Sequence, residues 1–158
     1  MAKFSKYKEL ISLIKQEFKI DFYGDHGLEH WQRVYDNTQK LAQHYKVASD
    51  VFELFALLHD SKREDELFDE KHGPRAAAYV KQLLNDEVIK LDKKDEQRLL
   101  YACANHTVTD ETNLLFQDVV VQICFDSDRL DIGRVGIEPE ASYMATDFAK
   151  KLVEISNK

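Results

Sequence analysis

Cysteine, proline and glycine are scarce in this sequence, and long apolar runs are missing. Its 158 residues include two cysteines, two prolines and five glycines. Cys103 and Cys124 lie within apolar helical patterns and are too few for a disulfide framework, so we expect reduced core thiols and a cytoplasmic protein. No run approaches the ~20 apolar residues of a membrane span, and the charged, amphipathic N-terminus lacks the apolar core of a signal peptide.

Positive charge is also in deficit. Lysine and arginine total 22 against 29 acidic residues, which gives a formal net charge of -7 at pH 7. This balance argues against binding to nucleic-acid polymers or anionic membranes, because like charges repel at long range. A local basic patch can still attract a phosphate group, so we expect any phosphorylated partner to be a compact molecule.

Residues that break helices are few and fall near the ends of apolar segments. The prolines lie at positions 74 and 139, and the dominant hydrophobic period is helical, which predicts an all-α fold. With 44% hydrophobic residues, the chain fits a single domain over 1–158 that buries roughly two thirds of its unfolded surface. The predicted helices cover about 4–19, 27–46, 49–60, 73–86, 92–107, 115–130 and 139–156, the last broken or starting late.

The stretch FALLHDSKR, residues 55–63, carries an apolar run directly into a histidine and an aspartate. Within 51–58 only Glu53 is polar, which indicates a helix surrounded by protein. His59 and Asp60 therefore end this helix in a buried setting. Because desolvation of an ionised carboxylate costs several kcal/mol, Asp60 should either point back to solvent or be matched by a cation or a metal.

Two further histidines are predicted to face the interior. His30 lies at the edge of the apolar stripe of the 27–46 helix, and His106 shares a helical face with Leu99 and Cys103. A single histidine in such a position is more often a hydrogen-bonded core residue. Together with His59, however, these histidines are harder to dismiss as core residues.

Three aspartates, Asp126, Asp128 and Asp131, follow the apolar run VVVQICF. Helix geometry does not choose among them, since Asp131 points nearest the apolar centre and the other two flank it. A calcium-binding EF-hand loop is excluded, because its sixth and twelfth positions require Gly and Glu where this chain has Asp131 and Ile137.

The segment HGLEH at 26–30 matches the pattern of inverted zinc metalloproteases, with His26 and His30 one turn apart and Glu29 as the base. This pattern is short and leaves the segments HDSKR and DSDRLD unexplained. The chain is also small for a chamber that encloses a peptide, so we set this interpretation aside.

Five segments, taken in order, resemble the HD-domain metal-dependent phosphohydrolase superfamily. They are HGLEHWQRV, FALLHDSKR, HG at 72–73, CANHT and DSDRLDIGRVGI, and they span about residues 22–138. The resemblance implies an all-α core and a divalent metal held by His30, His59, Asp60 and Asp128. Asp128 is chosen over Asp126 because the aspartate of the family precedes a basic residue and a leucine. Mn is the first expectation for the ion, with Fe, Co, Ni, Mg and Zn as alternatives.

Some members of this superfamily bind two metals, and His72 and His106 match the additional ligands in kind, so we expect one or two ions per chain. The alternative for His72 is a surface residue ahead of the helix that starts at Gly73-Pro74. The resemblance also assigns Asp60 to orient or deprotonate the attacking water, and His106 to the catalytic centre. Substrate contacts are expected from His26, Lys62, Arg63 and Arg129, with Arg33 and Arg134 as further cations nearby.

The expected function is hydrolysis of a small phosphorylated molecule, foremost a nucleotide, by metal-activated water that attacks phosphorus. Two alternatives stay open: a di-iron oxygenase of the same fold, and a non-catalytic metal-binding or signalling domain. The sequence leaves the substrate, the metal and the oligomeric state undetermined.

Overall fold

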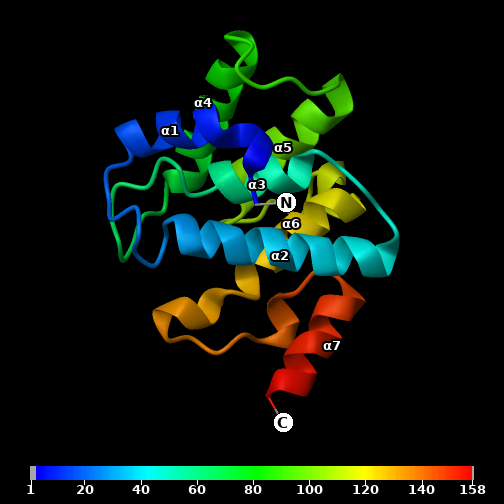
Figure 1. Ribbon diagram of the computed structural model, residues 1–158. Helices are drawn as coiled ribbons and strands as arrows, with labels where there is room; N and C mark the ends of the chain where they lie inside the picture. The colour runs from blue at the N-terminus through cyan, green and yellow to red at the C-terminus, as the bar shows by residue number, and fades with distance from the viewer. Residues whose placement is uncertain (1–2, 158) are drawn as a thin grey trace.

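The computed structural model describes residues 3–157, and all regular secondary structure in this range is helical (Figure 1). Four short 3-10 helices accompany the α-helices. The predicted all-α fold is confirmed, and the last predicted segment is indeed broken, with a 3-10 helix ahead of a late α-helix. The α-helices are α1 (Lys8–Glu17), α2 (Leu28–Tyr45), α3 (Val51–Leu58), α4 (His72–Asn85), α5 (Lys93–Asn105), α6 (Val119–Arg129) and α7 (Asp147–Ser156).

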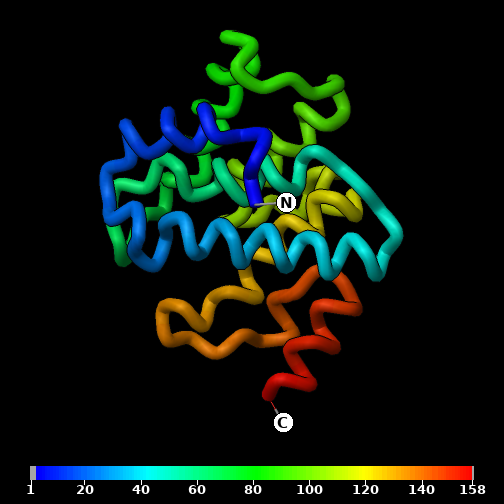
Figure 2. The backbone as a smooth tube through the Cα atoms, viewed as in Figure 1, coloured from blue at the N-terminus to red at the C-terminus, as the bar shows by residue number. Residues whose placement is uncertain are grey.

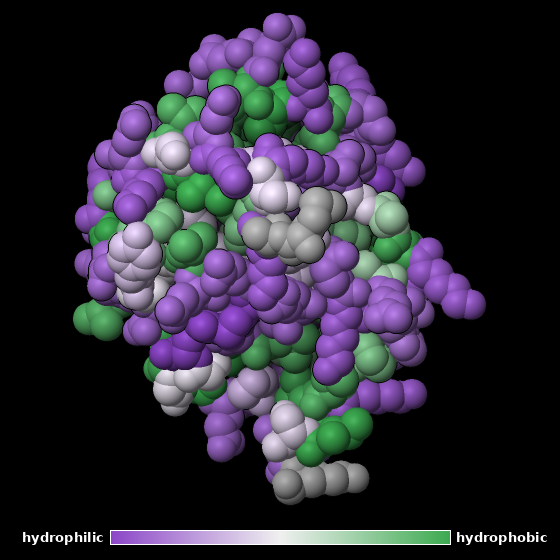
Figure 3. Space-filling view, in the orientation of Figure 1, coloured by the Kyte–Doolittle hydropathy of each residue, from purple (hydrophilic) through white to green (hydrophobic). Residues whose placement is uncertain are grey.

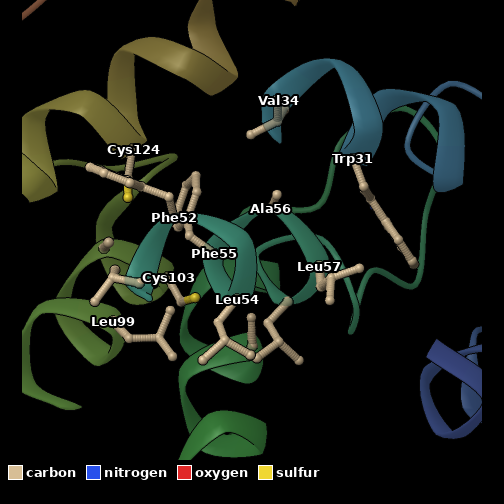
Figure 4. Packing of buried hydrophobic residues seen from close by; sticks show 14 of the residues in the cluster. Trp31, Val34, Phe52, Leu54, Phe55, Ala56, Leu57, Leu99, Cys103 and Cys124 are labelled. Carbon is tan, nitrogen blue, oxygen red and sulfur yellow. The ribbon is translucent and has the colours of Figure 1, made fainter. Parts of the chain in front are cut away.

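Helix α3 forms the centre of the molecule. Every residue of α3 except Glu53 is buried, and α2, α5 and α6 all pack against this helix. Figure 4 shows Phe52, Phe55 and Leu57 of α3 among side chains of the surrounding helices. Because α3 is enclosed on nearly all sides, its C-terminal end lies in the interior, and so do His59 and Asp60, which follow it directly.

The starts of three helices are set by side-chain caps. Asp92, Asp118 and Thr146 accept hydrogen bonds from backbone amides in the first turns of α5, α6 and α7. Such caps typically stabilise a helix by about 1 kcal/mol each. The caps of α5 and α6 fix where these two helices begin, and so they contribute to the alignment of the ends that carry His106 and Asp128.

The segment after α6 passes beneath α2 and ends in α7, on the side of α2 opposite α1 and α4 (Figure 2). The 3-10 helices Ile132–Val135 and Ala141–Tyr143 lie in this segment. The face drawn in Figure 3 is mainly hydrophilic, with hydrophobic residues in small areas. Within residues 3–157, no helix is both long and apolar enough to cross a membrane.

Candidate metal centre

Four side chains from three parts of the fold meet at the end of α3. His59 and Asp60 follow α3 directly, while α2 contributes His30 and α6 contributes Asp128. The Nε2 atoms of His30 and His59 lie 3.0 Å apart, and Oδ2 of Asp60 lies 3.3 Å from each. Oδ1 of Asp128 lies 3.1 Å from Nε2 of His30 and 3.4 Å from Nε2 of His59. We call these four residues the first ligand group.

A second ligand group consists of Asp60, His72 and His106. His72 begins α4 and His106 follows α5, and their Nε2 atoms are 2.8 Å apart. Oδ1 of Asp60 lies 3.0 Å from Nε2 of His72 and 3.5 Å from Nε2 of His106. Asp60 therefore faces one ligand group with each of its oxygens. His72 is only 1% exposed, so the alternative of a surface histidine is wrong.

All four histidines are oriented through Nδ1. Nδ1 of His30 lies 2.6 Å from a carboxylate oxygen of Asp131, whereas the other three histidines use backbone carbonyl groups at 2.5 to 3.1 Å. These acceptors assign the Nδ1 proton, so that in a neutral ring the lone pair is on Nε2. Metal-binding histidines are commonly oriented in this way. The carbonyl acceptors belong to Phe55 and Ala56 for His59, Asp69 for His72 and Cys103 for His106.

The donor set fits divalent cations. Two ligands about 2.1 Å from one ion, on neighbouring coordination positions, lie about 3.0 Å apart, which matches the separations of the facing Nε2 atoms. In addition, Oδ2 of Asp60 and Oδ1 of Asp128 are buried and have no hydrogen-bond partner. Buried oxygens without a donor are destabilising, and a cation held between them and the imidazoles would satisfy them.

Electrostatics within the first ligand group reinforce this fit. Burial acts to raise the pKa of Asp60 and Asp128, but the neighbouring histidines outweigh it and hold both pKa values well below the usual range. Burial acts to lower the pKa of His59, but the negative charge of Asp60 and contacts with Asp128 raise it to about 10. Both carboxylates are therefore ionised, and without a metal a proton on His59 compensates them in part.

Asp126 has a different position from Asp128. It is fully buried and accepts hydrogen bonds from the amides of Ala145 and Thr146, at 2.7 and 2.8 Å, and from the Thr146 hydroxyl at 2.7 Å. These contacts fasten the segment before α7 to α6. The structure thus brings Asp128, and not Asp126, to the ligand groups.

The ligand groups open into a pocket of about 960 Å³. Its lining includes three of the four substrate-contact residues expected from the sequence, His26, Arg63 and Arg129. Arg134 and the ligand-group residues His106 and Asp128 line it as well. Lys62 does not reach this pocket, because its ammonium group lies 2.7 Å from Glu17 and 4.0 Å from the centre of the Tyr79 ring. Arg33 is likewise directed to Asp131, at 2.8 Å.

His26 connects the pocket to the loop after α3. Its Nε2 atom donates to the carbonyl oxygen of Glu66 at 2.7 Å, and its Nδ1 atom lies 3.4 Å from Nη2 of Arg134. The same Nδ1 atom is 4.0 Å from Oδ2 of Asp60. Burial lowers the pKa of His26, so a neutral ring is favoured beside the first ligand group.

The arginines divide into two sets by their partners. Arg33, Arg75 and Arg98 bind carboxylates of Asp131, Asp69, Asp95 and Asp118. In the pocket, by contrast, the guanidinium groups donate their hydrogen bonds to neutral oxygens, and the carboxylates of Asp60 and Asp128 lie farther off, 3.7 Å from Arg63 and 4.0 Å from Arg134. A cation on those carboxylates would leave the arginines available to an anion. The hydrogen bonds to neutral oxygens are those of Arg63 with the carbonyl of Asp65, Arg129 with the carbonyl of Tyr143 and the hydroxyl of Thr109, and Arg134 with the carbonyls of Asp25 and Asp131.

The sequence did not predict two of these arrangements. Asp131 was one of three candidate ligands, and the structure places it behind His30, where it orients the ring. The sequence did carry one signal for this position, because helix geometry predicted that the side chain of Asp131 points nearest the apolar centre. The contrast between the two arginine sets depends on backbone carbonyls from distant loops, for which the sequence pattern carries no signal.

No protein-family model matches the chain, and none of the curated proteins shows significant similarity to it. A solved structure does: the crystal structure of a predicted HD superfamily hydrolase from an uncultured Thermotogales bacterium, at 27% sequence identity and a TM-score of 0.65. The match covers 94% of this chain and 84% of the other. With the adjacent His59 and Asp60 among the ligand groups, this similarity supports the resemblance of the chain to the HD-domain superfamily.

Proposed function

We propose that the protein is a metal-dependent phosphohydrolase that acts on small phosphorylated molecules, foremost nucleotides. The similar Thermotogales protein carries the description of a predicted hydrolase, which supports hydrolysis as the reaction class. The phosphate specificity rests on the pocket. The first ion would be held by His30, His59, Asp60 and Asp128, and a second by Asp60, His72 and His106.

One observation carries the proposal: unpartnered groups of opposite charge lie side by side. Buried oxygens of Asp60 and Asp128 lack a donor, and the buried Nε of Arg63 lacks an acceptor. Nε of Arg63 is 3.7 Å from Oδ1 of Asp60, and Nη2 of Arg134 is 4.0 Å from Oδ1 of Asp128. A cation on the carboxylates and a phosphate oxygen on Arg63 would satisfy all three unpartnered atoms together.

Each residue then has a definite task. Divalent ions held in this centre would supply Lewis acidity to a phosphoryl oxygen and would lower the pKa of water. Asp60 faces both ligand groups and would orient the attacking water between them. Arg63 and Arg134 flank the ligand groups and would neutralise phosphate oxygens, while Arg129 extends the positive lining toward Tyr143.

The test combines metal analysis with turnover of a panel of nucleoside mono-, di- and triphosphates and simple phosphate esters. We expect Mn-loaded protein to release phosphate or pyrophosphate, and a chelator to abolish the release. Arg63→Ala should lower kcat/KM by about 10- to 100-fold and retain metal, because charge-assisted hydrogen bonds contribute about 1.5–3 kcal/mol. Lys62→Ala is the matched control and should stay within about twofold of the wild type, since Lys62 is directed to Glu17.

Two outcomes would contradict the proposal. Tightly bound metal without turnover of any phosphate compound, with each of Mn, Co, Ni, Mg, Zn and Fe, would favour a metal-binding module. Oxygen consumption by the reduced iron protein with a small polyol or phosphonate would instead identify the oxygenase alternative.

A further inference from the structure

Beyond its polar floor, the pocket has a wall of exposed apolar side chains. Leu67 is 90% exposed and Phe68 is 79% exposed, and both line the pocket. Phe116, Ile137 and Tyr143 line it as well. Large apolar residues that gather at an exposed site commonly mark a binding surface. The question is therefore which part of a ligand would cover them.

The loop that presents Leu67 and Phe68 is fixed by residues of the site itself. Three backbone carbonyl oxygens of this loop face the site. The carbonyl of Asp65 accepts a hydrogen bond from Arg63, and the carbonyl of Glu66 accepts one from His26. The carbonyl oxygen of Asp69 lies 2.5 Å from Nδ1 of His72. The backbone on both sides of Leu67 and Phe68 is thus held by these side chains. This arrangement keeps the two apolar side chains at the pocket, where the cost of ordering them on binding is reduced.

The arginines and the glutamates of the pocket lining differ in depth. Arg63 is buried and Arg129 and Arg134 are partly buried, whereas the glutamates of the lining are all exposed. With cations on Asp60 and Asp128, as proposed above, an anionic group is favoured at the inner end and disfavoured at the outer end. The outer part of the ligand should be uncharged or positive, apolar on its faces, and able to donate hydrogen bonds to carboxylates. The exposed glutamates are Glu66, Glu111, Glu138 and Glu140.

A nucleobase with an amino group has these properties. Its flat faces stack on aromatic side chains, and its exocyclic amine donates hydrogen bonds at its edge. We propose that the outer half of the pocket is a nucleobase site, with Leu67 and Phe68 against the base and the phosphate directed inward to Arg63 and Arg134. This inference rests on the proposed phosphohydrolase function and names the specificity-determining residues for it.

The experiment compares adenosine 5′-monophosphate with ribose 5-phosphate, which carries a hydroxyl group in place of the base. We expect the Mn-loaded wild type to prefer the nucleotide by roughly tenfold or more in kcat/KM, as base stacking on a side chain usually allows. Leu67→Ser and Phe68→Ser should remove most of that preference and leave ribose 5-phosphate hydrolysis within about twofold. Leu114→Ser is the matched control, because Leu114 is 89% exposed and lies outside the pocket lining; it should change neither substrate.

Equal loss on both substrates in Phe68→Ser, or no preference in the wild type, would overturn the nucleobase site while hydrolysis itself remains established. If the wild type hydrolyses neither compound, the proposed function fails and the nucleobase site is decided by calorimetric titration. In that case, tighter binding of the nucleotide than of ribose 5-phosphate, lost in Phe68→Ser, supports the site. Equal binding of the two compounds refutes it.

Discussion

At the scale of single residues, two aspartates on α6 have opposite tasks. Asp128 leaves a buried carboxylate oxygen without a partner at the ligand groups, whereas Asp126 satisfies three hydrogen-bond donors of the segment before α7. They lie two residues apart, and successive helical residues are rotated by about 100°, so their side chains leave the helix on opposite sides. One side faces the metal centre and the other faces the C-terminal segment.

Substitution should separate these two tasks. Asp126→Ala should lower the free energy of unfolding by about 3 kcal/mol, because it leaves buried donors without an acceptor, and should retain metal. Asp128→Ala should remove most metal from the first ligand group and destabilise the metal-free protein less. Urea unfolding with chelator, together with elemental analysis of the folded proteins, measures both effects. Loss of metal in Asp126→Ala with full occupancy in Asp128→Ala would reverse the assignment.

At the scale of elements, the sequence predicted the helices and the burial of α3 well. An almost wholly apolar 51–58 segment required a helix surrounded by protein, and this placed His59 and Asp60 in the interior. The pattern could not show which ring nitrogen of each histidine faces the ligand groups. In the structure, His59 and His106 donate from Nδ1 to carbonyls three or four residues earlier in the chain. That local geometry depends on how each helix ends, and a periodic pattern does not specify it.

The second ligand group depends on close packing of α4 against α5. A Cβ atom at Gly73 would lie 2.9 Å from the carbonyl oxygens of Cys103 and Ala104. Cys103 also provides the carbonyl group that orients His106. A side chain at position 73 would therefore push the start of α4, with His72, away from His106.

We expect Gly73→Ala to reduce bound metal from two ions to about one and to destabilise the fold by about 1–3 kcal/mol, although alanine has the higher helix propensity. Gly133→Ala is the control, since a Cβ atom there meets nothing within 4 Å. Elemental analysis after loading with excess Mn, combined with urea unfolding, provides the measurement. Two full metal sites in Gly73→Ala would show that the second ligand group tolerates a shift of α4.

At the scale of the whole molecule, a negatively charged protein gathers three of its arginines around one pocket. The net charge of -7 is consistent with the expectation of compact partners, and the predicted cations Arg63 and Arg129 do line the pocket. Lys62 is adjacent to Arg63 in sequence yet binds Glu17 of α1. Position along the chain could not distinguish these two neighbours, because their partners come from elements far away in the sequence.

Burial of the first ligand group also couples metal binding to the release of a proton. In the metal-free protein, the pKa of His59, raised to about 10, means that this ring is protonated at neutral pH. A proton at Nε2 occupies the nitrogen that a metal requires, so binding of the first ion should release it. The stabilisation from protonated His59 is fully present below its ordinary pKa of 6.5 and is lost as the pH rises through about 10.

Metal affinity should consequently rise with pH, by about tenfold per pH unit between pH 7 and 9 if one proton is released per ion. Calorimetric titration of Mn in buffers with different ionisation enthalpies measures that number directly. A metal concentration of about 100 times Kd should also raise the free energy of unfolding by about 2.7 kcal/mol, seen as a higher Tm. An affinity independent of pH over this range would show that His59 is already neutral in the metal-free protein, and that the ligand groups are preformed without a proton.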